Sequence, residues 1–193
     1  MKVILVHGWL NNPFIMRGLA NDLTRKGHAC VVPSLRPSDG RGGLAMLSRK
    51  LQDVIDAAFP SESERFALIG FSMGVIVCRY YLQELGGHAR ARAFFSICGP
   101  HAGTRLAHFF PTQGIREMRP ESAFLAQLER SSTRLGSLPI VCYWTPFDMM
   151  IRPLASARWK MGEAVRVLSP LHAFMPFHKF VRADIARRLA ALE

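Results

Sequence analysis

Cysteines and acidic residues are few in this 193-residue chain, and long apolar runs are missing. The four cysteines stand far apart in apolar stretches, so we expect neither a metal site of the C-x-x-C kind nor a disulfide framework. No apolar run approaches the ~20 residues that a membrane-spanning helix needs. The chain opens on a predicted strand without the pattern of a signal peptide, so a cytoplasmic location is the default expectation.

The shortage of acids leaves a formal net charge of +11, and the excess sits toward the two ends of the chain. Residues 1–50 hold eight basic and two acidic residues, and residues 151–193 hold eight and three. Such an excess favours anionic partners, either acidic substrates or a peripheral contact with an anionic membrane surface. Alternatively, the basic residues lie on exposed helix faces and only keep the protein soluble. No nucleic-acid partner is expected, because no basic run is interleaved with aromatic residues.

Predicted strands and helices alternate along most of the chain, which is typical of a parallel sheet covered on both faces. An apolar content of 49% suffices for such a sheet. We therefore predict one α/β domain over residues 1–193, a three-layer αβα arrangement with a mostly parallel sheet of about six strands. Segment 105–135 interrupts the alternation and carries short apolar stretches. It is a candidate lid or cap, with ordinary packing helices as the alternative.

Ser72 lies in the pattern Gly70-Phe71-Ser72-Met73-Gly74, between an apolar strand-like run and a predicted helix. Strand, sharp turn and helix form the context in which G-x-S-x-G presents an exposed nucleophilic serine. The two glycines are needed because side chains there would collide with the neighbouring strand and helix. A serine that merely caps the helix is the alternative.

A serine nucleophile needs a histidine base and a carboxylate that orients it, and both are found downstream of Ser72. Asp148 follows the predicted strand 138–144, and His172 follows the predicted strand 164–168. Both therefore fall in loops at the edge where parallel sheets place their sites. Alternatively, Asp148 only caps a turn, and His172 only forms hydrogen bonds with the backbone. His178 is the rival base, although the pattern of the last helix includes it.

These motifs resemble those of small bacterial lipases and esterases of the α/β-hydrolase superfamily. Residues 2–9 are similar to the family's first core strand with its HG motif, and residues 95–107 are similar to its P-H-x-G-[ST] strand and loop. The stretches that begin at Asp148 and His172 are similar to those around the family's acid and base. The resemblance spans nearly the whole chain, from Lys2 to the final helix.

The resemblance implies a serine hydrolase with the triad Ser72, His172 and Asp148, working through an acyl-enzyme without a metal or an organic cofactor. The backbone N–H groups of Trp9 and Met73 would form its oxyanion hole. The expected substrate is a small-molecule carboxylic ester, of medium chain length or a lipid. Five residues are expected to contact it: Leu10, His101, Phe109, Phe110 and Phe124.

Two other functions remain open at the level of the sequence. The same triad could serve acyl transfer or thioester cleavage, which competing acyl acceptors would distinguish. A degenerate hydrolase fold could instead bind a lipid or a protein without catalysis. Covalent labelling by a fluorophosphonate would separate this last function from the enzymatic ones. The oligomeric state is open as well.

Overall fold

The computed structural model describes residues 1–192, and its centre is a sheet of six parallel strands in the order β2-β1-β3-β4-β5-β6. The predicted α/β class and strand number are confirmed, and the sheet is parallel throughout. Its strands are β1 (Lys2–Val6), β2 (Ala29–Val31), β3 (Phe66–Phe71), β4 (Ala91–Ile97), β5 (Ile140–Trp144) and β6 (Glu163–Arg166).

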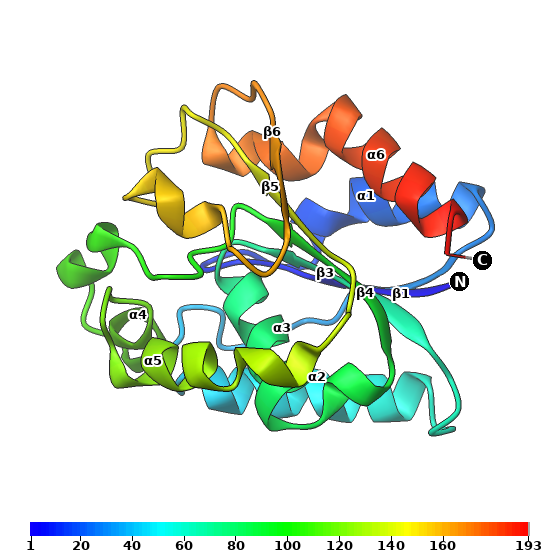
Figure 1. Cartoon of the computed structure of the whole chain (residues 1–193), viewed down its shortest axis with the longest axis horizontal. Helices are drawn as coiled ribbons and strands as arrows, with labels where there is room; N and C mark the ends of the chain where they lie inside the picture. Colours follow the sequence, from blue (N-terminus) through cyan, green and yellow to red (C-terminus); the bar gives the residue numbers. More distant parts are fainter. Residues whose placement is uncertain (193) are drawn as a thin grey trace.

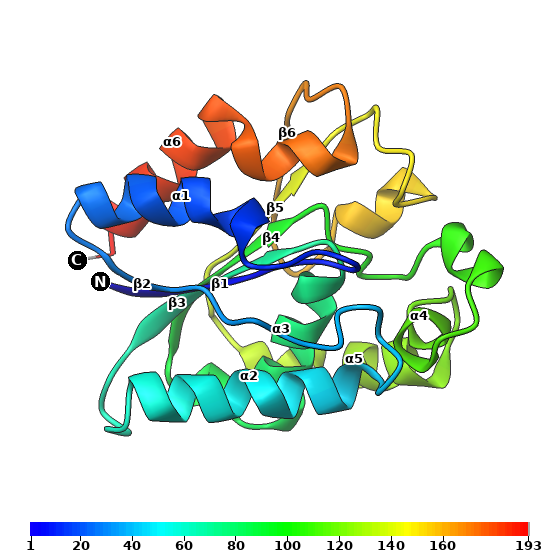
Figure 2. The same ribbon diagram turned by 180° about the vertical axis from the view of Figure 1, so that it is seen from behind.

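Helices cover both faces of the sheet, as the alternation of elements predicted (Figures 1 and 2). One face carries α1 (Phe14–Arg25) and α6 (Lys179–Ala190), and the other carries α2 (Leu44–Ala58) and α3 (Met73–Glu84). No helix in the described part of the chain is both long enough and apolar enough to cross a bilayer.

The central strands are apolar on both sides because each side faces a helical layer. In β1, Ile4 and Val6 belong to the core beneath α2 and α3, whereas Val3 and Leu5 belong to the core beneath α1. All four side chains are fully buried. Each face therefore has its own hydrophobic core. Because all six strands are parallel, their carboxyl ends lie at one edge of the sheet.

Short helices occupy the connections at both edges of the sheet. They are η1 (Gly87–Ala89), η2 (Arg105–Phe109), α4 (Gln113–Glu117), α5 (Ala123–Arg130), η3 (Ser132–Leu135), η4 (Leu154–Ala157) and η5 (His172–Phe177). In Figure 1 the loop after β4, drawn in green, projects beyond the end of the sheet on the left.

The candidate lid segment 105–135 divides into two parts in the structure. Helix α5 packs on α3 through the buried side chains of Leu125 and Leu128, and its Phe124 ring stacks on Tyr80 at 5.3 Å between centroids. This half corresponds to the ordinary packing helix. By contrast, η2 and α4 carry Ala107 and Ile115, which line the pocket described below.

Candidate active site

Ser72 stands at the turn between β3 and α3 in a left-handed conformation, with φ 54° and ψ −124°. Such a backbone is costly for a residue with a side chain and persists where the surroundings enforce it. The Ser72 N–H donates to the carbonyl of Ile97 in β4 at 2.9 Å. The hydroxyl makes no cap hydrogen bond to α3, so the interpretation of Ser72 as a helix cap is wrong.

The glycines of the elbow are required by close contacts with backbone. A Cβ at Gly74 would lie 2.5 Å from the His7 carbonyl oxygen, and one at Gly70 would lie 2.8 Å from the Val75 Cα. Gly8 faces the elbow from β1's exit loop, where a Cβ would come 2.9 Å from the Ser72 Cβ. The loop after β1 and the start of α3 are therefore in contact around Ser72.

That contact places two backbone N–H groups beside the serine. Met73 is the first residue of α3, where a helix has no internal acceptor for its N–H, and Trp9 follows Gly8 directly. Neither N–H donates a backbone hydrogen bond in the turns and loops of residues 1–192. Both groups, together with the positive end of the α3 dipole, are thus available to an oxyanion.

His7 keeps the β1 exit loop in place. Its Nδ1 bonds to the Gly8 carbonyl at 3.1 Å, and its Nε2 accepts a hydrogen bond from the Leu35 N–H at 3.1 Å. Burial lowers the pKa of His7, so the ring is neutral, as an Nε2 acceptor requires. His7 therefore supports the loop rather than competing with His172 as a base.

Asp148 and His172 meet in the structure across 24 residues of chain. The His172 Nδ1 lies 2.7 Å from the Asp148 Oδ2, and both residues are buried. The other carboxylate oxygen, Oδ1, accepts hydrogen bonds from the N–H groups of Met150 at 2.8 Å and Ile151 at 2.9 Å. Both oxygens of the carboxylate therefore bond to donors, which fixes both the acid and the ring.

The pKa of Asp148 reflects two opposing effects. Burial raises it, while the hydrogen bond and charge of His172 and the bonds from the Ile151 and Met150 amides lower it. The lowering effects prevail together, so the pKa lies below its ordinary value and Asp148 is an anion at neutral pH. In a neutral ring, the bond to this anion holds the proton on Nδ1 and leaves Nε2 as the acceptor, which is the tautomer a base needs.

The His172 ring also contacts the elbow itself. It packs on the ring of Phe71, the residue before Ser72, with 4.9 Å between centroids. Among residues 1–192, the hydrogen bonds do not include one between the Ser72 hydroxyl and His172, so a movement of one of the two side chains would have to close that pair. Catalytic hydrogen bonds are often long in an empty site and tighten around substrate.

Threonine side chains tie the loops of the site together. Thr145 Oγ1 donates to the Ser169 carbonyl at 2.6 Å, which joins the Asp148 loop to the His172 loop. Thr104 Oγ1 donates to the Met150 carbonyl at 2.7 Å and accepts from the Arg152 N–H at 3.1 Å. The P-H-x-G-T loop thus holds the acid loop, a role that the sequence motif alone did not indicate.

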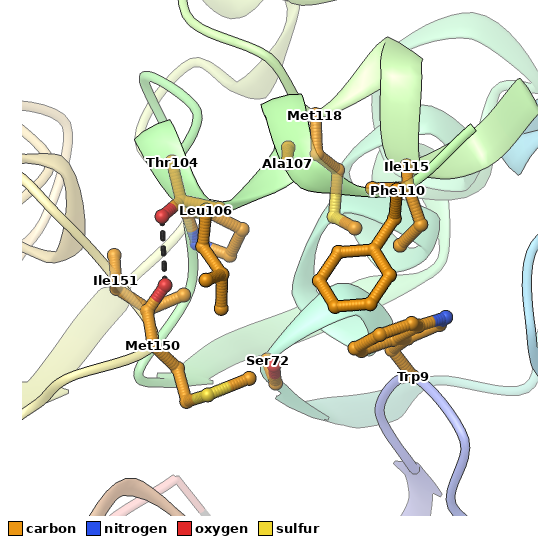
Figure 3. A pocket seen from close by; sticks show the side chains of 11 residues that line it. Trp9, Ser72, Thr104, Leu106, Ala107, Phe110, Ile115, Met118, Met150 and Ile151 are labelled. Carbon is orange, nitrogen blue, oxygen red and sulfur yellow. Dashed lines mark hydrogen bonds between the residues drawn. The ribbon is translucent and has the colours of Figure 1, made fainter. Parts of the chain in front are cut away.

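A mainly apolar pocket, partly open to solvent, has Ser72 in its wall. Figure 3 shows Ser72 at its base, between Met150 on one side and Trp9 on the other. The Phe110 ring packs edge-on against Trp9 at 4.6 Å between centroids. Other lining residues are Pro100, Thr104, Leu106, Ala107, Ile115, Met118 and Ile151. This lining suits an apolar acyl group.

Of the five residues predicted to contact substrate, only Phe110 lines this pocket. The other four lie elsewhere because tertiary packing directs them away. Leu10 and Phe109 are exposed, and Phe124 stacks on α3. His101 is buried between Ser96, whose Oγ is 2.8 Å from its Nε2, and the Trp159 ring, 4.7 Å away between centroids. We leave these four out of the proposed substrate site.

Sequence reasoning missed most of the pocket wall and one neighbour of the acid. The apolar pair Met150 and Ile151, directly after Asp148, was a signal that could have indicated the wall. The neighbour of the acid is Cys98, whose apolar surroundings in the sequence indicate only a small core residue. Its Sγ, one Asp148 oxygen and one His172 nitrogen lie within 4.8 Å of one another. Burial, and next the charge of Asp148, raises the pKa of Cys98 well above its usual range, so a neutral thiol borders the acid.

Comparison with known proteins gives a family match over most of the chain. A family model described as palmitoyl protein thioesterase matches residues 2–134. The lysosomal thioesterases PPT2 of Mus musculus and Rattus norvegicus are each 30% identical to the chain over 118 residues. The match covers 57% of this chain and 39% of either relative, so the chain matches about two fifths of the relatives' length.

Solved structures share the fold at low sequence identity. Aspergillus fumigatus lipase B has a TM-score of 0.82 at 15% identity, over 98% of this chain and 52% of that chain. The mature Bacillus licheniformis lipase BlEst2 has a TM-score of 0.75 at 12% identity, over 99% and 91%. The RedJ thioesterase of Streptomyces coelicolor has 0.64 at 18%, over 100% and 90%. The likeness confirms the predicted α/β-hydrolase fold.

Proposed function

The chain belongs to the palmitoyl protein thioesterase family of α/β-hydrolases, and from this premise we propose that it hydrolyses thioesters of apolar acyl chains through Ser72, His172 and Asp148. The observation that carries the proposal is the position of Ser72. It stands in a strained elbow in the wall of an apolar pocket, and a buried Asp148–His172 pair packs against the same elbow.

In the proposed reaction, the Ser72 Oγ attacks the acyl carbonyl carbon while the His172 Nε2 takes the hydroxyl proton. Asp148 holds the ring and stabilises its positive charge. The carbonyl oxygen becomes an oxyanion between the Trp9 and Met73 N–H groups. When the C–S bond breaks, His172 returns the proton to the leaving thiol, and the acyl group remains on Ser72.

A water molecule then repeats the sequence on the acyl-enzyme. His172 takes a proton from the water, the resulting hydroxide attacks the carbonyl carbon, and the proton returns to the Ser72 oxygen as the acid leaves. The pocket supports an apolar acyl group, because Leu106, Ile115 and Met118 offer no hydrogen bonds to a polar chain.

Cleavage of carboxylic esters with the same acyl chain is the second candidate. An alcohol replaces the thiol as the leaving group, and the acyl-enzyme is identical. The solved lipase structures share the fold with this chain, which makes the candidate worth testing. The alternatives of acyl transfer and of a binding module without catalysis remain outcomes of the experiment below.

The test combines active-site labelling with matched substrates. A fluorophosphonate should label the wild type and the variant Ser34→Ala, an exposed serine after β2, but not Ser72→Ala. Hydrolysis of an S-acyl and an O-acyl compound with one chain length then separates thioesterase from esterase. If the folded wild type is neither labelled nor active on either compound, the catalytic proposal fails. If the acyl group is transferred to an added alcohol or amine in preference to water, the protein is an acyltransferase and the proposed hydrolysis is wrong.

A further inference from the structure

The described residues expose ten large apolar side chains, and all ten lie in segments that follow the carboxyl end of a strand. They are Leu10, Phe14, Phe109, Phe147, Met149, Leu168, Leu171, Phe174, Phe177 and Phe180. These segments belong to the loops after β1, β4, β5 and β6 and to the helix starts that follow them. In Figure 1 this edge is on the left, and in Figure 2 it is on the right.

The same edge carries the mouth of the Ser72 pocket. We call the segments 8–14, 34–43, 98–122, 145–158 and 167–180 the rim. Phe109 is 80% exposed and follows Ala107 of the pocket wall by two residues, and Met149 is 66% exposed beside Met150 of that wall. Exposed apolar side chains that gather on one face of a protein mark an interaction site.

The charge of the rim indicates which partner fits it. Its segments contain eight arginines and lysines against four acids, and one of these acids, Asp148, is buried. Another acid, Asp39, pairs with Arg41 at 2.6 Å. The exposed side chains of Arg105 and Arg152 make no ion pair with any described residue, and their backbones are joined by the bond from the Arg105 N–H to the Arg152 carbonyl at 2.8 Å.

From these features we propose that the rim docks on an anionic lipid surface. Apolar side chains spread over four loops suit a fluid interface, into which each can insert separately, better than the single groove of a peptide site. The unpaired arginines add electrostatic attraction to anionic headgroups. Docking in this orientation turns the mouth of the pocket to the lipid, so an acyl chain can pass from the bilayer to Ser72. This last consequence rests on the proposed function, whereas docking does not.

Sedimentation with lipid vesicles tests the proposal without relying on catalysis. The 193-residue chain with Ser72→Ala is mixed with vesicles of phosphatidylcholine alone or of phosphatidylcholine with an equal amount of phosphatidylglycerol. We expect sedimentation with the mixed vesicles and a loss of binding at high salt, because salt screens the attraction. If Ser72 proves not to be a nucleophile while this binding persists, the proposed function fails and the docking stands.

Paired variants identify the surface. Phe14→Ser with Phe109→Ser should weaken partitioning about tenfold, because two inserted rings are lost. Arg105→Gln with Arg152→Gln should weaken partitioning about 25-fold, because each arginine near an anionic surface contributes about fivefold. Lys26→Gln with Arg65→Gln changes the charge equally at the opposite edge and should leave partitioning close to that of the wild type. Thermal unfolding verifies that each variant is folded.

Three results would overturn the proposal. Absence of binding to both kinds of vesicle excludes a lipid surface. Equal losses for the rim arginines and for the opposite-edge pair exclude the rim as the docking face. The third result is a wild type that binds no vesicles and is a dimer, whereas the variant with Phe14→Ser and Phe109→Ser is a monomer. In that case the rim is the interface with a second copy of the chain.

Discussion

Gly8 lies against the side chain of Ser72, so closely that a methyl group at Gly8 would come 2.9 Å from the Ser72 Cβ. Two loops that are 64 residues apart in the chain thus share one contact. The contact positions the Trp9 N–H relative to the serine, and this makes Gly8 a residue whose size controls the geometry of the proposed oxyanion hole.

We expect Gly8→Ala to separate the two loops. Because the added methyl group overlaps Ser72, kcat/KM should fall by about 10²-fold or more, as when one oxyanion donor is lost. Stability should decrease by about 1–3 kcal/mol, which is typical of overpacking. In a Ser72→Gly background the overlap is removed, so the same change should cost less stability in a thermal unfolding cycle. An equal cost in both backgrounds would show that the contact is not responsible.

Asp148→Asn should lower kcat by about 10⁴-fold with little change in KM. The asparagine oxygen can still accept the Met150 and Ile151 N–H groups, but its NH₂ group would face the His172 Nδ1. The ring would then carry its proton on Nε2, where it cannot act as a base. Steady-state kinetics measure the effect. Activity close to that of the wild type in a folded variant would remove Asp148 from the proposed triad.

Ala107→Leu should shift the acyl preference toward shorter chains. Ala107 is buried in the pocket wall, so a larger side chain occupies space that a long acyl group needs. We expect kcat/KM for the longest accepted chain to fall about tenfold or more, with short chains affected less. Ala102→Leu is the matched control, because Ala102 is exposed and outside the pocket. A uniform loss over all chain lengths would contradict this role.

Asp184→Asn should change stability but not the site. Its carboxylate accepts the Tyr143 hydroxyl at 2.8 Å and the Arg188 Nε at 2.8 Å, and it pairs with Arg187. Burial raises the pKa of Asp184, but the bonds from Arg188, Arg187 and Tyr143 together leave it below its ordinary value of 3.8. A lowered folded-state pKa contributes stability above the ordinary value, and this contribution is lost as the pH falls through the folded value.

The difference in unfolding free energy between the wild type and Asp184→Asn should therefore be about 2 kcal/mol at neutral pH. It should shrink once the pH falls below about 3.8. Denaturant titrations at several pH values measure it. Asp53→Asn, at an exposed position of α2, is the control and should show little difference at any pH. A difference that grows on acidification would contradict the predicted sign.

Local sequence patterns were sufficient to predict those structural features that depend only on residues close together in the chain. The apolar run before Ser72, its flanking glycines and the helical pattern after it predicted the strand, turn and helix that the structure shows. The spacing of Leu44, Leu47 and Leu51 likewise predicts a helix, which spans 44–58 in the structure, and Gly27 predicts the end of α1, where its φ is 88°. The last helix shows that such patterns do not predict the boundary of a helix. Phe177, Val181, Ile185 and Leu189 stand four residues apart, which predicts one apolar stripe on a helix. The last three are buried, but Phe177 precedes α6 and is 43% exposed.

By itself the amino-acid sequence determined the class of fold and the order in which serine, acid and histidine follow their strands, because backbone conformation and side-chain periodicity are short-range properties. Only the tertiary structure decided which side chains meet. It joined Asp148 to His172, set Gly8 against Ser72, built the pocket from loops distant in the chain, and directed Leu10, His101, Phe109 and Phe124 elsewhere. Such contacts depend on how loops close against one another in space, and spacing along the chain does not encode that.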